Sequence, residues 1–414
     1  MATIGYNNAA WIRVESPVVD TPPMQRAAAD SVERDLLIDV SRLIWRLWSG
    51  RLPTGIDRVC LAYVQHFGDR ARAVVQRKAN RSVLGPALSD RLFAILTAGG
   101  PRFRARFLAL LPHFAADLVT APGYRGKVFL NMGHTGLNEP SLPKWIGAHA
   151  LKPVYFVHDL IPIAHPEFCR SGEAEKHQRR MRNVLRTAVG VIGNSQATLD
   201  DLAAFANANG LPMPPTLVAW IAGLGRPEVA RPATMQRPYF ITIGTIEGRK
   251  NHILLLQIWR RLARELGSDT PYLVIVGQRG WEATHALEML DHAPDLAPHV
   301  REFPQSEDAE LTRMIAGARA LLMPSFAEGF GLPVVEALQL GTPVIASDLR
   351  ALREISGGVP TFLDPIDGKA WERTIRSFSD DSAERRRQLT LMSAYHPPNW
   401  ATHFTRVEEW LVTL

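Results

Sequence analysis

Short apolar runs that alternate with longer amphipathic segments constrain the fold of this chain more than any other feature of its sequence. DLLIDV at 35–40 is one such run, and PVYFVHD at 153–159 and YLVIVG at 272–277 are others. Near-continuous apolar runs of this length are typical of strands buried on both faces of a parallel sheet. Helical patterns such as 173–188 lie between several of them. The alternation predicts an α/β fold with helices on both faces of parallel sheets.

A Pro-rich segment at 226–238 separates two series of these elements. The other predicted strands are 127–132, 190–195 and 217–223 before it, and 239–244, 300–305, 320–325 and 342–348 after it. A chain of 414 residues is also longer than one hydrophobic core supports, so two domains are expected. We predict a loose N-terminal arm (1–34), an N-terminal Rossmann-like domain (35–225), a linker (226–238), a C-terminal Rossmann-like domain (239–396) and a C-terminal helix (397–414) that packs back on the N-terminal domain.

The charge balance of the chain favours anionic partners. Its net charge is +6, which suits nucleotides, phospholipid surfaces or nucleic acid without choosing among them. The two cysteines match no metal-binding or redox spacing, so a disulfide framework is not expected and a cytoplasmic location is predicted. No apolar run has the length of a transmembrane helix, and the N-terminus lacks the order of a signal peptide.

Two glutamates eight residues apart mark the loop and the helix that follow the predicted strand 320–325. In FAEGFGLPVVEALQLG, Glu328 lies in a Gly-rich loop, and Glu336 is predicted in the first turn of a helix that begins at Pro333. The free backbone N–H groups of a helix start favour an anion. Complementing the helix dipole would explain Glu336 equally well. Glu328, beside an anion site, is better explained as an acceptor for ligand hydroxyls.

Two adjacent cations form the companion motif, GTIEGRKNH at 244–252. Arg249 and Lys250 follow a predicted strand, and paired cations at a strand's carboxyl end can hold a pyrophosphate. A solvated basic pair is the usual interpretation of two neighbouring cations. Because the acidic loop also follows a strand of the same domain, both motifs belong to the edge where such sheets bind ligands. The sequence therefore favours a phosphate site.

These motifs, with Glu354 after them, resemble the donor-binding half of a known family. It is the large retaining glycosyltransferase family, glycosyl transferases group 1, that includes bacterial mannosyltransferases and sucrose synthase-like enzymes. The resemblance is dense over 239–358 and thinner before it. It implies the GT-B fold, in which two Rossmann-like domains face each other across a cleft. The C-terminal domain would then bind a nucleotide-sugar donor, and the N-terminal domain an acceptor.

The resemblance also implies a role for each motif residue. Arg249 and Lys250 would contact the donor diphosphate. Glu328 would hold the hydroxyls of the donor sugar, and Glu336 would bind the nucleotide ribose. Backbone contacts to the donor are implied for Gly244, Phe330, Gly331 and Leu332.

The N-terminal half matches the family more loosely. PVYFVHDLIP resembles the family's strand that ends in His-Asp, which implies that His158 faces the donor sugar, although a core histidine is the general interpretation. GNSQATLDDL at 193–202 resembles the strand and helix start that commonly follow. RLPTGIDRV at 51–59 occupies the position of the first glycine-rich loop. The family often has two adjacent glycines and an Arg there, whereas this chain has Gly55 alone, followed by Arg58. The resemblance implies that Gly55 binds the donor phosphate.

The resemblance implies a retaining hexosyl transfer. The acceptor would attack the sugar from the same face that the leaving group departs, so no enzyme side chain is expected to act as a nucleophile. Paired cations and a helix start can stabilise a diphosphate leaving group without a metal ion. The chain has no DxD motif, and we expect neither a metal nor another cofactor. GDP-mannose is the first donor to test, with a UDP-sugar as the alternative. The expected acceptor is a glycan or a polyprenyl-linked saccharide in surface polysaccharide biosynthesis.

Three other protein classes fit the sequence less well. A dinucleotide oxidoreductase would carry a GxGxxG motif after a strand, and none is present. A phosphorylase of similar architecture would need a lysine bound to pyridoxal phosphate. A non-catalytic nucleic-acid-binding protein would use the basic charge, but it would not explain the acidic loop that carries Glu328. No nucleic-acid partner is therefore expected.

A basic and aromatic segment at 69–118 suggests a contact with an anionic membrane. Arg102, Arg104 and Arg106 are mixed with Phe103 and Phe107, as cations and aromatics are in membrane-surface contacts. An ordinary amphipathic helix packed on the N-terminal sheet is the alternative. Trp45 and Trp48, three residues apart, are expected in the core. The membrane interpretation places the protein peripherally at the inner face of the membrane.

Overall fold

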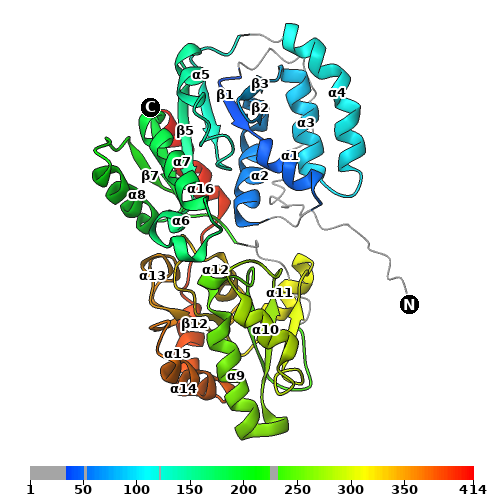
Figure 1. Ribbon diagram of the computed structural model, residues 1–414, viewed down its shortest axis with the longest axis vertical. Coiled ribbons are helices and arrows are strands. Elements are labelled where there is room, and N and C mark those ends of the chain that lie inside the picture. Colours follow the sequence, from blue (N-terminus) through cyan, green and yellow to red (C-terminus); the bar gives the residue numbers. More distant parts are fainter. Residues whose placement is uncertain (1–33, 51–53, 121–122, 224–231) are drawn as a thin grey trace.

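Two α/β units lie one above the other along the long axis of the molecule (Figure 1). The computed structural model describes residues 34–50, 54–120, 123–223 and 232–414. The upper unit contains the N-terminal sheet and the last helix of the chain, and the lower unit contains the second sheet. The predicted arm, except for Arg34, and the first part of the predicted linker lie outside the described residues.

The N-terminal unit contains a seven-stranded sheet with the order β3-β2-β1-β4-β5-β6-β7. Its strands are β1 (Leu36–Asp39), β2 (Ala71–Arg77), β3 (Asn80–Val83), β4 (Val128–Asn131), β5 (Lys152–Val157), β6 (Gly190–Gly193) and β7 (Thr216–Val218). Neighbouring strands are parallel except β2 and β3, which form an antiparallel pair at one edge. In β1, Leu36 and Ile38 pack in one apolar cluster and Leu37 in another, so both faces of the sheet are covered.

The β2–β3 hairpin corrects the amphipathic-helix alternative for residues 69–118, because the first part of this segment is strand. The strand ARAVVQR buries the polar side chains of Arg72 and Gln76. Arg72 Nε donates to the Leu84 carbonyl at 2.7 Å, and Gln76 Nε2 donates to the Asp39 carboxylate at 2.6 Å. Buried polar groups that have partners are tolerated in a core but break the apolar pattern from which strands are predicted.

The C-terminal unit contains a six-stranded parallel sheet with the order β10-β9-β8-β11-β12-β13. Its strands are β8 (Tyr239–Ile243), β9 (Tyr272–Val276), β10 (Val300–Phe303), β11 (Leu321–Met323), β12 (Val344–Ser347) and β13 (Thr361–Leu363). Alternate residues of β9 belong to two apolar clusters, Leu273 and Ile275 to one and Val274 to the other. The cluster with Val274 also contains Phe156 of the N-terminal unit, so apolar packing continues from one unit to the other.

Helices cover both sheets (Figure 1). The N-terminal unit has α1 (Ser41–Trp48), α2 (Gly55–Phe67), α3 (Pro86–Ala98), α4 (Phe103–Thr120), α5 (Leu142–Ala148), α6 (Ile161–Ala164), α7 (Glu173–Thr187) and α8 (Gln196–Ala208). The C-terminal unit has α9 (His252–Leu266), α10 (Thr284–His292), α11 (Asp308–Gly317), α12 (Leu332–Gln339), α13 (Arg350–Ser356), α14 (Gly368–Ser379) and α15 (Ala383–Met392). The short 3₁₀ helices are η1 (Gly68–Arg70), η2 (Pro166–Phe168), η3 (Gly248–Lys250) and η4 (Gly267–Asp269).

The last helix, α16 (Trp400–Leu411), returns to the N-terminal unit (Figure 1). His403 Nε2 lies 3.0 Å from the Tyr63 hydroxyl on α2, and His403 Nδ1 lies 3.0 Å from the Trp220 carbonyl. The Trp410 ring lies so close to Gly190 that a Cβ there would be 2.5 Å from it. The chain therefore crosses between the units twice, once after β7 and once before α16.

Several expected boundaries differ from the structure. Helix α12 begins at Leu332, so Glu336 lies in its second turn and does not complement the helix start. Strand β7 is three residues long and ends at Val218, because the chain leaves the sheet there toward the other unit. The expectation of a core position was wrong for Trp45, which is 62% exposed.

Candidate active site

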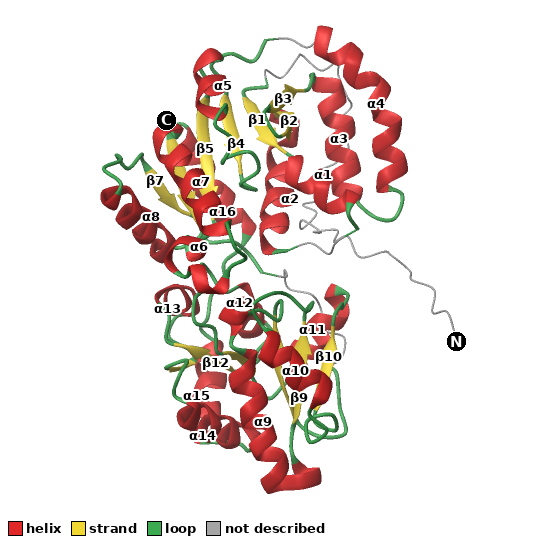
Figure 2. Ribbon diagram, in the orientation of Figure 1, coloured by secondary structure: helices red, strands yellow, loops and turns green. Residues whose placement is uncertain are grey.

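Loops of both units meet between α6 and α12 (Figure 2). In the C-terminal unit, β8 and β11 are neighbouring parallel strands, so the segments that follow them share one edge of the sheet. The loop after β8 leads into η3, and the loop after β11 leads into α12. The two loops are tied together, because Phe326 N donates to the Arg249 carbonyl at 2.8 Å and the Arg249 guanidinium donates to the Ala327 carbonyl at 3.0 Å.

Four charged side chains of these loops form one cluster. Lys250 Nζ lies 2.6 Å from Glu328 Oε1, and Arg249 Nη1 lies 3.0 Å from Glu328 Oε2. The Arg249 Nε lies 2.7 Å from Glu247 Oε1. All four side chains are largely buried, so two cations and two carboxylates balance each other in a site with little water.

The pKa shifts follow from this balance. Burial raises the pKa of the Glu328 carboxyl, but the charges of Lys250 and Arg249 outweigh burial and lower it from 4.5 to about 2. Burial also lowers the pKa of Lys250, although Glu328 opposes that shift. Glu328 is therefore a carboxylate at neutral pH. Its contribution to stability is present above pH 4.5 and is lost as the pH falls toward 2.

Glu247 and Gly244 complete the loop after β8. Burial raises the pKa of Glu247, although Arg249 and Lys250 lower it. Glu247 was not among the predicted site residues, and its place in the motif GTIEGRKNH was the signal that could have found it. Gly244 has φ +135°, and a Cβ there would lie 3.3 Å from Lys250 Cε, so Gly244 gives the lysine its path into the cluster.

The start of α12 lies next to this cluster in sequence, directly after the loop of Glu328. Gly331 precedes the helix with φ +104°, and a Cβ there would lie 2.3 Å from Leu352 Cδ2, so only glycine fits. The side chain of Phe330 is buried. No side chain caps the first turn of α12, which begins at Leu332. Pro333 has no N–H group and Val334 N donates to the Gly331 carbonyl at 2.9 Å, so the Leu332 N–H is the group of this turn that can bind an anion.

Glu336 points from α12 to the N-terminal unit. The Arg58 guanidinium on α2 lies 3.0 Å from Glu336 Oε1 and 3.0 Å from Asp308 Oδ1. Burial raises the pKa of Glu336, and the charge of Arg58 opposes that shift. Gly55 is the first residue of α2, and a Cβ there would lie 3.0 Å from Leu332 Cδ1. Asp308 was missed, because nothing in the sequence links the start of α11 to α2.

His158 follows β5 and is buried. Its Nε2 lies 2.7 Å from the Met132 carbonyl, which can only accept a hydrogen bond. Burial lowers the pKa of His158 to about 4, although the bond to Met132 opposes that shift. The ring is therefore neutral at pH 7, with its proton on Nε2 and a lone pair on Nδ1. His134 lies close by, with its ring centroid 5.2 Å from that of His158.

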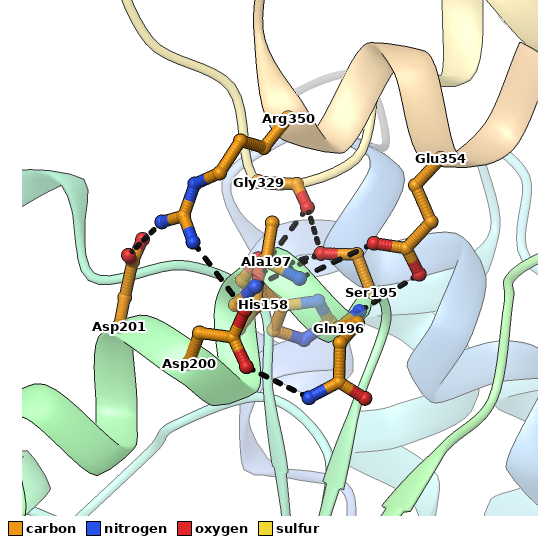
Figure 3. A network of polar contacts seen from close by, with 10 residues as sticks. His158, Ser195, Gln196, Ala197, Asp200, Asp201, Gly329, Arg350 and Glu354 are labelled. Atoms are coloured by element: carbon orange, nitrogen blue, oxygen red, sulfur yellow. Dashed lines mark hydrogen bonds and ion pairs between the residues drawn. The ribbon is translucent and has the colours of Figure 1, made fainter.

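Three further contacts cross between the units beside the cluster, and sequence reasoning identified none of them. The Phe168 ring stacks on Phe326 of the acidic loop with centroids 5.4 Å apart, and Trp281 Nε1 donates to the Phe168 carbonyl at 3.2 Å. On the other side, the Ser195 hydroxyl at the start of α8 donates to the Gly329 carbonyl at 2.8 Å (Figure 3).

The predicted basic residues lie elsewhere. Arg102, Arg104 and Arg106 are exposed at and near the start of α4, at the outer edge of the N-terminal unit (Figure 1). Arg104 Nε donates to the Trp48 carbonyl at 2.8 Å, and its guanidinium lies over the Trp48 ring. The structure thus brings Arg249, Lys250 and Glu328 together and leaves the three arginines on a separate surface.

Residues 229–390 match the family model described as Glycosyl transferases group 1. One curated relative is the serotype-specific mannosyltransferase WbdA of Escherichia coli, which is 31% identical over 218 residues, or 49% of this chain and 26% of WbdA. Another is the O-antigen chain mannosyltransferase B of Escherichia coli, which is 37% identical over 145 residues, or 35% of this chain and 38% of that protein. The chain therefore spans less than half the length of these relatives.

Solved structures agree with the architecture at low sequence identity. HepE of Anabaena, solved in complex with UDP-glucose, has a TM-score of 0.63 at 16% identity and covers 92% of this chain and 99% of HepE. Sucrose-phosphate synthase of Thermosynechococcus elongatus has a TM-score of 0.59 at 15% identity, with 91% and 98% covered. These similarities concern the fold alone and confirm the predicted arrangement of two α/β domains.

Proposed function

Residues 229–390 form a glycosyl transferases group 1 domain within a GT-B fold, and from this premise we propose that the chain is a retaining, metal-independent hexosyltransferase that uses a nucleotide sugar. The observation that carries the proposal is the cluster of Glu328 with Arg249 and Lys250 next to the uncapped start of α12. Cations and a helix start suit a diphosphate. Carboxylates suit the hydroxyls of a sugar and a ribose.

Donor binding would exchange one set of ion pairs for another. The diphosphate takes the N–H donors of Arg249 and Lys250 from Glu328. Glu328 then accepts hydrogen bonds from the donor sugar, and Glu336 accepts them from the ribose. As the bond between the anomeric carbon and the phosphate oxygen breaks, the two cations stabilise the charge that develops on the leaving diphosphate. These fixed positive charges are the reason to propose transfer without a metal ion.

The stereochemical part of the proposal is retention. The acceptor oxygen forms its bond to the anomeric carbon on the face that the diphosphate leaves, and a phosphate oxygen takes the acceptor's proton. The neutral ring of His158 contributes a polar edge beside the sugar and does not donate a proton, since burial lowers its pKa to about 4.

Mannose is the first sugar to propose, because both curated relatives described above are named as mannosyltransferases. The donor would then be GDP-mannose, and the acceptor a glycan or a polyprenyl-linked saccharide of a surface polysaccharide. A UDP-sugar is the second candidate, since HepE was solved with UDP-glucose.

Calorimetric titration with a panel of nucleotide sugars, followed by transfer assays with EDTA, tests the proposal. We expect GDP-mannose to bind more tightly than the UDP-sugars, and EDTA to leave turnover unchanged because protein cations carry the leaving-group charge. Product anomers identified by NMR test retention. Reversible loss of turnover in EDTA would contradict metal independence, and failure of every nucleotide sugar to bind would contradict the function itself.

The location of the enzyme is a separate proposal, that the surface around α4 contacts an anionic membrane. In the described ranges, no helix is both long and apolar enough to cross a membrane. Arg102 and Arg106 are exposed, and Leu108 and Leu111 of α4 are 49% and 45% exposed. Exposed cations and apolar side chains together match the headgroup and acyl regions of an anionic leaflet. Such a contact would bring a polyprenyl-linked acceptor to the enzyme.

Vesicle sedimentation tests the membrane proposal. The double variant Arg102→Glu/Arg106→Glu is expected to bind phosphatidylglycerol vesicles at least about tenfold more weakly, because each basic residue near the surface contributes about 1 kcal/mol. The control is Arg264→Glu, an exposed arginine in the last turn of α9, a helix of the lower unit (Figure 1). Equal binding by the double variant and the wild type would contradict the proposal.

A further inference from the structure

One carboxylate joins helix α13 of the C-terminal unit to helix α8 of the N-terminal unit. Glu354 Oε1 accepts hydrogen bonds from Gln196 N at 2.8 Å and from Trp220 Nε1 at 2.9 Å. Its Oε2 accepts one from Ala197 N at 3.2 Å (Figure 3). All three donors belong to the other unit.

The carboxylate completes the cap of α8. The first N–H groups of a helix have no partner inside it, and a negative charge there is favoured by the helix dipole. The Ser195 hydroxyl accepts from Thr198 N at 3.1 Å, as an N-cap residue does. Glu354 takes the N–H groups of Gln196 and Ala197, which the Ser195 side chain does not reach. The C-terminal unit thus supplies part of the cap of a helix in the N-terminal unit.

The same helix start holds the loop that carries Glu328. The Ser195 hydroxyl donates to the Gly329 carbonyl at 2.8 Å. The Thr198 hydroxyl lies 3.2 Å from that carbonyl and 3.3 Å from the His158 carbonyl. A Cβ on Gly329 would lie 2.2 Å from the His158 carbonyl oxygen, so the two backbones approach as closely as glycine allows. Gly329 directly follows Glu328, so the position of one sets the position of the other.

We propose that Glu354 is a positioning residue for sugar transfer. It fixes the start of α8 on the C-terminal unit, so that the hydroxyls of Ser195 and Thr198 hold the Glu328 loop against His158. The inference rests on the proposed function, because it takes Glu328 to contact the donor sugar. Glu354 acts through α8 and not on the donor.

Arg350 provides a matched control on the same two helices. Its guanidinium pairs with Asp200 at 3.3 Å and with Asp201 at 2.6 Å (Figure 3). These pairs hold the second turn of α8 and not its start. Arg350 is also 65% exposed, and exposed ion pairs contribute little. Both residues join the two units, but only Glu354 reaches the helix start that holds Gly329.

The first experiment compares Glu354→Gln with Arg350→Ala. Glutamine keeps the size of the side chain but turns an NH2 group toward N–H donors. We expect kcat to fall by about 10- to 100-fold, because small displacements of a group that contacts the reacting sugar are costly. The Kd for GDP or UDP is expected to stay within about twofold of the wild type, since Arg249, Lys250 and Glu336 remain in place. Arg350→Ala is expected to change neither value.

A double variant tests whether Ser195 lies on the same path. Ser195→Ala removes one hydrogen bond to Gly329, and Thr198 keeps the other, so a smaller fall in kcat is expected. Because both substitutions release the same loop, Glu354→Gln/Ser195→Ala is expected to lower kcat less than the product of the single effects. Independent, multiplicative effects would contradict the path through α8.

Hydrogen exchange separates this inference from the proposed function. Amides of residues 326–331 are expected to exchange faster in Glu354→Gln than in the wild type. In Arg350→Ala their exchange rates are expected to equal those of the wild type. Unchanged exchange, or equal losses of kcat and of nucleotide affinity, would overturn the inference even if the wild type transfers sugar. The wild type could also bind no nucleotide sugar while Glu354→Gln exchanges faster. That result would support the coupling between Glu354 and the loop, but it would overturn both the role of Glu354 in transfer and the proposed function.

Discussion

Replacing Glu328 with glutamine is expected to lower kcat by about 10³-fold while the affinity for a nucleoside diphosphate stays unchanged or rises. The amide has the size of the carboxylate but cannot hold sugar hydroxyls with two charged acceptor oxygens. It also stops competing for Lys250 and Arg249, which lie 2.6 and 3.0 Å from the carboxylate. Lys250 is then released from its carboxylate partner toward the diphosphate, whereas Arg249 keeps its pair with Glu247. Turnover and nucleotide affinity therefore change independently.

Steady-state kinetics and calorimetric titration with GDP and UDP measure the two effects. Glu372→Gln is the matched control, because Glu372 on α14 pairs with Arg376 and Arg261 on helices away from the acidic loop. Its kcat is expected to stay within about twofold of the wild type. A Glu328→Gln enzyme that keeps more than about a tenth of the wild-type kcat would contradict the assigned role, and so would a parallel loss of nucleotide affinity.

A Lys250→Met substitution is expected to lower kcat/KM by about 10³-fold and to weaken nucleoside diphosphate binding by about 10- to 100-fold. Methionine fills similar space without the charge. The cluster of Glu247, Arg249, Lys250 and Glu328 then holds two carboxylates and one cation in place of two of each. Its net charge is negative before the diphosphate arrives. Donor binding and leaving-group stabilisation both lose the same cation.

The pH dependence of binding gives a second measurement of Lys250. Burial lowers its pKa although Glu328 raises it, so the affinity of the wild type for GDP or UDP is expected to fall at alkaline pH as the ammonium loses its proton. That fall is expected to be absent from Lys250→Met. Lys176→Met on α7, a half-buried lysine paired with Glu173, is the control. If Lys250→Met binds GDP and UDP as tightly as the wild type at every pH, Lys250 has no role at the diphosphate.

Much of the architecture could be predicted because parallel strands covered on both faces require consecutive apolar side chains. Strands β1, β5 and β9 coincide with the apolar runs of the sequence for that reason. The β2–β3 hairpin could not be found in this way, since Arg72 and Gln76 are buried with hydrogen-bond partners. The end of β7 was misplaced because the apolar residues after Val218 pack where the chain crosses to the other unit, not in the sheet.

The candidate site divides in the same way. Lys250 and Glu328 could be expected near each other from sequence, because each follows a strand and the carboxyl ends of parallel strands share one edge. Glu247 was overlooked although it stands inside the same motif. The partners of Glu336 could not be anticipated, since Arg58 and Asp308 come from helices in different units.

The sequence by itself determined the two series of strands and helices, and the chemistry at the ends of their strands, because these depend on local periodicity and residue type. Only the tertiary structure decided which residues meet across the two units. Arg58 and Glu336 are 278 positions apart, and Gln196 and Glu354 are 158 apart. Pairs this distant leave no periodic signal. Their contact depends on how two separately formed sheets dock, which is set by packing over the whole interface and by no single motif.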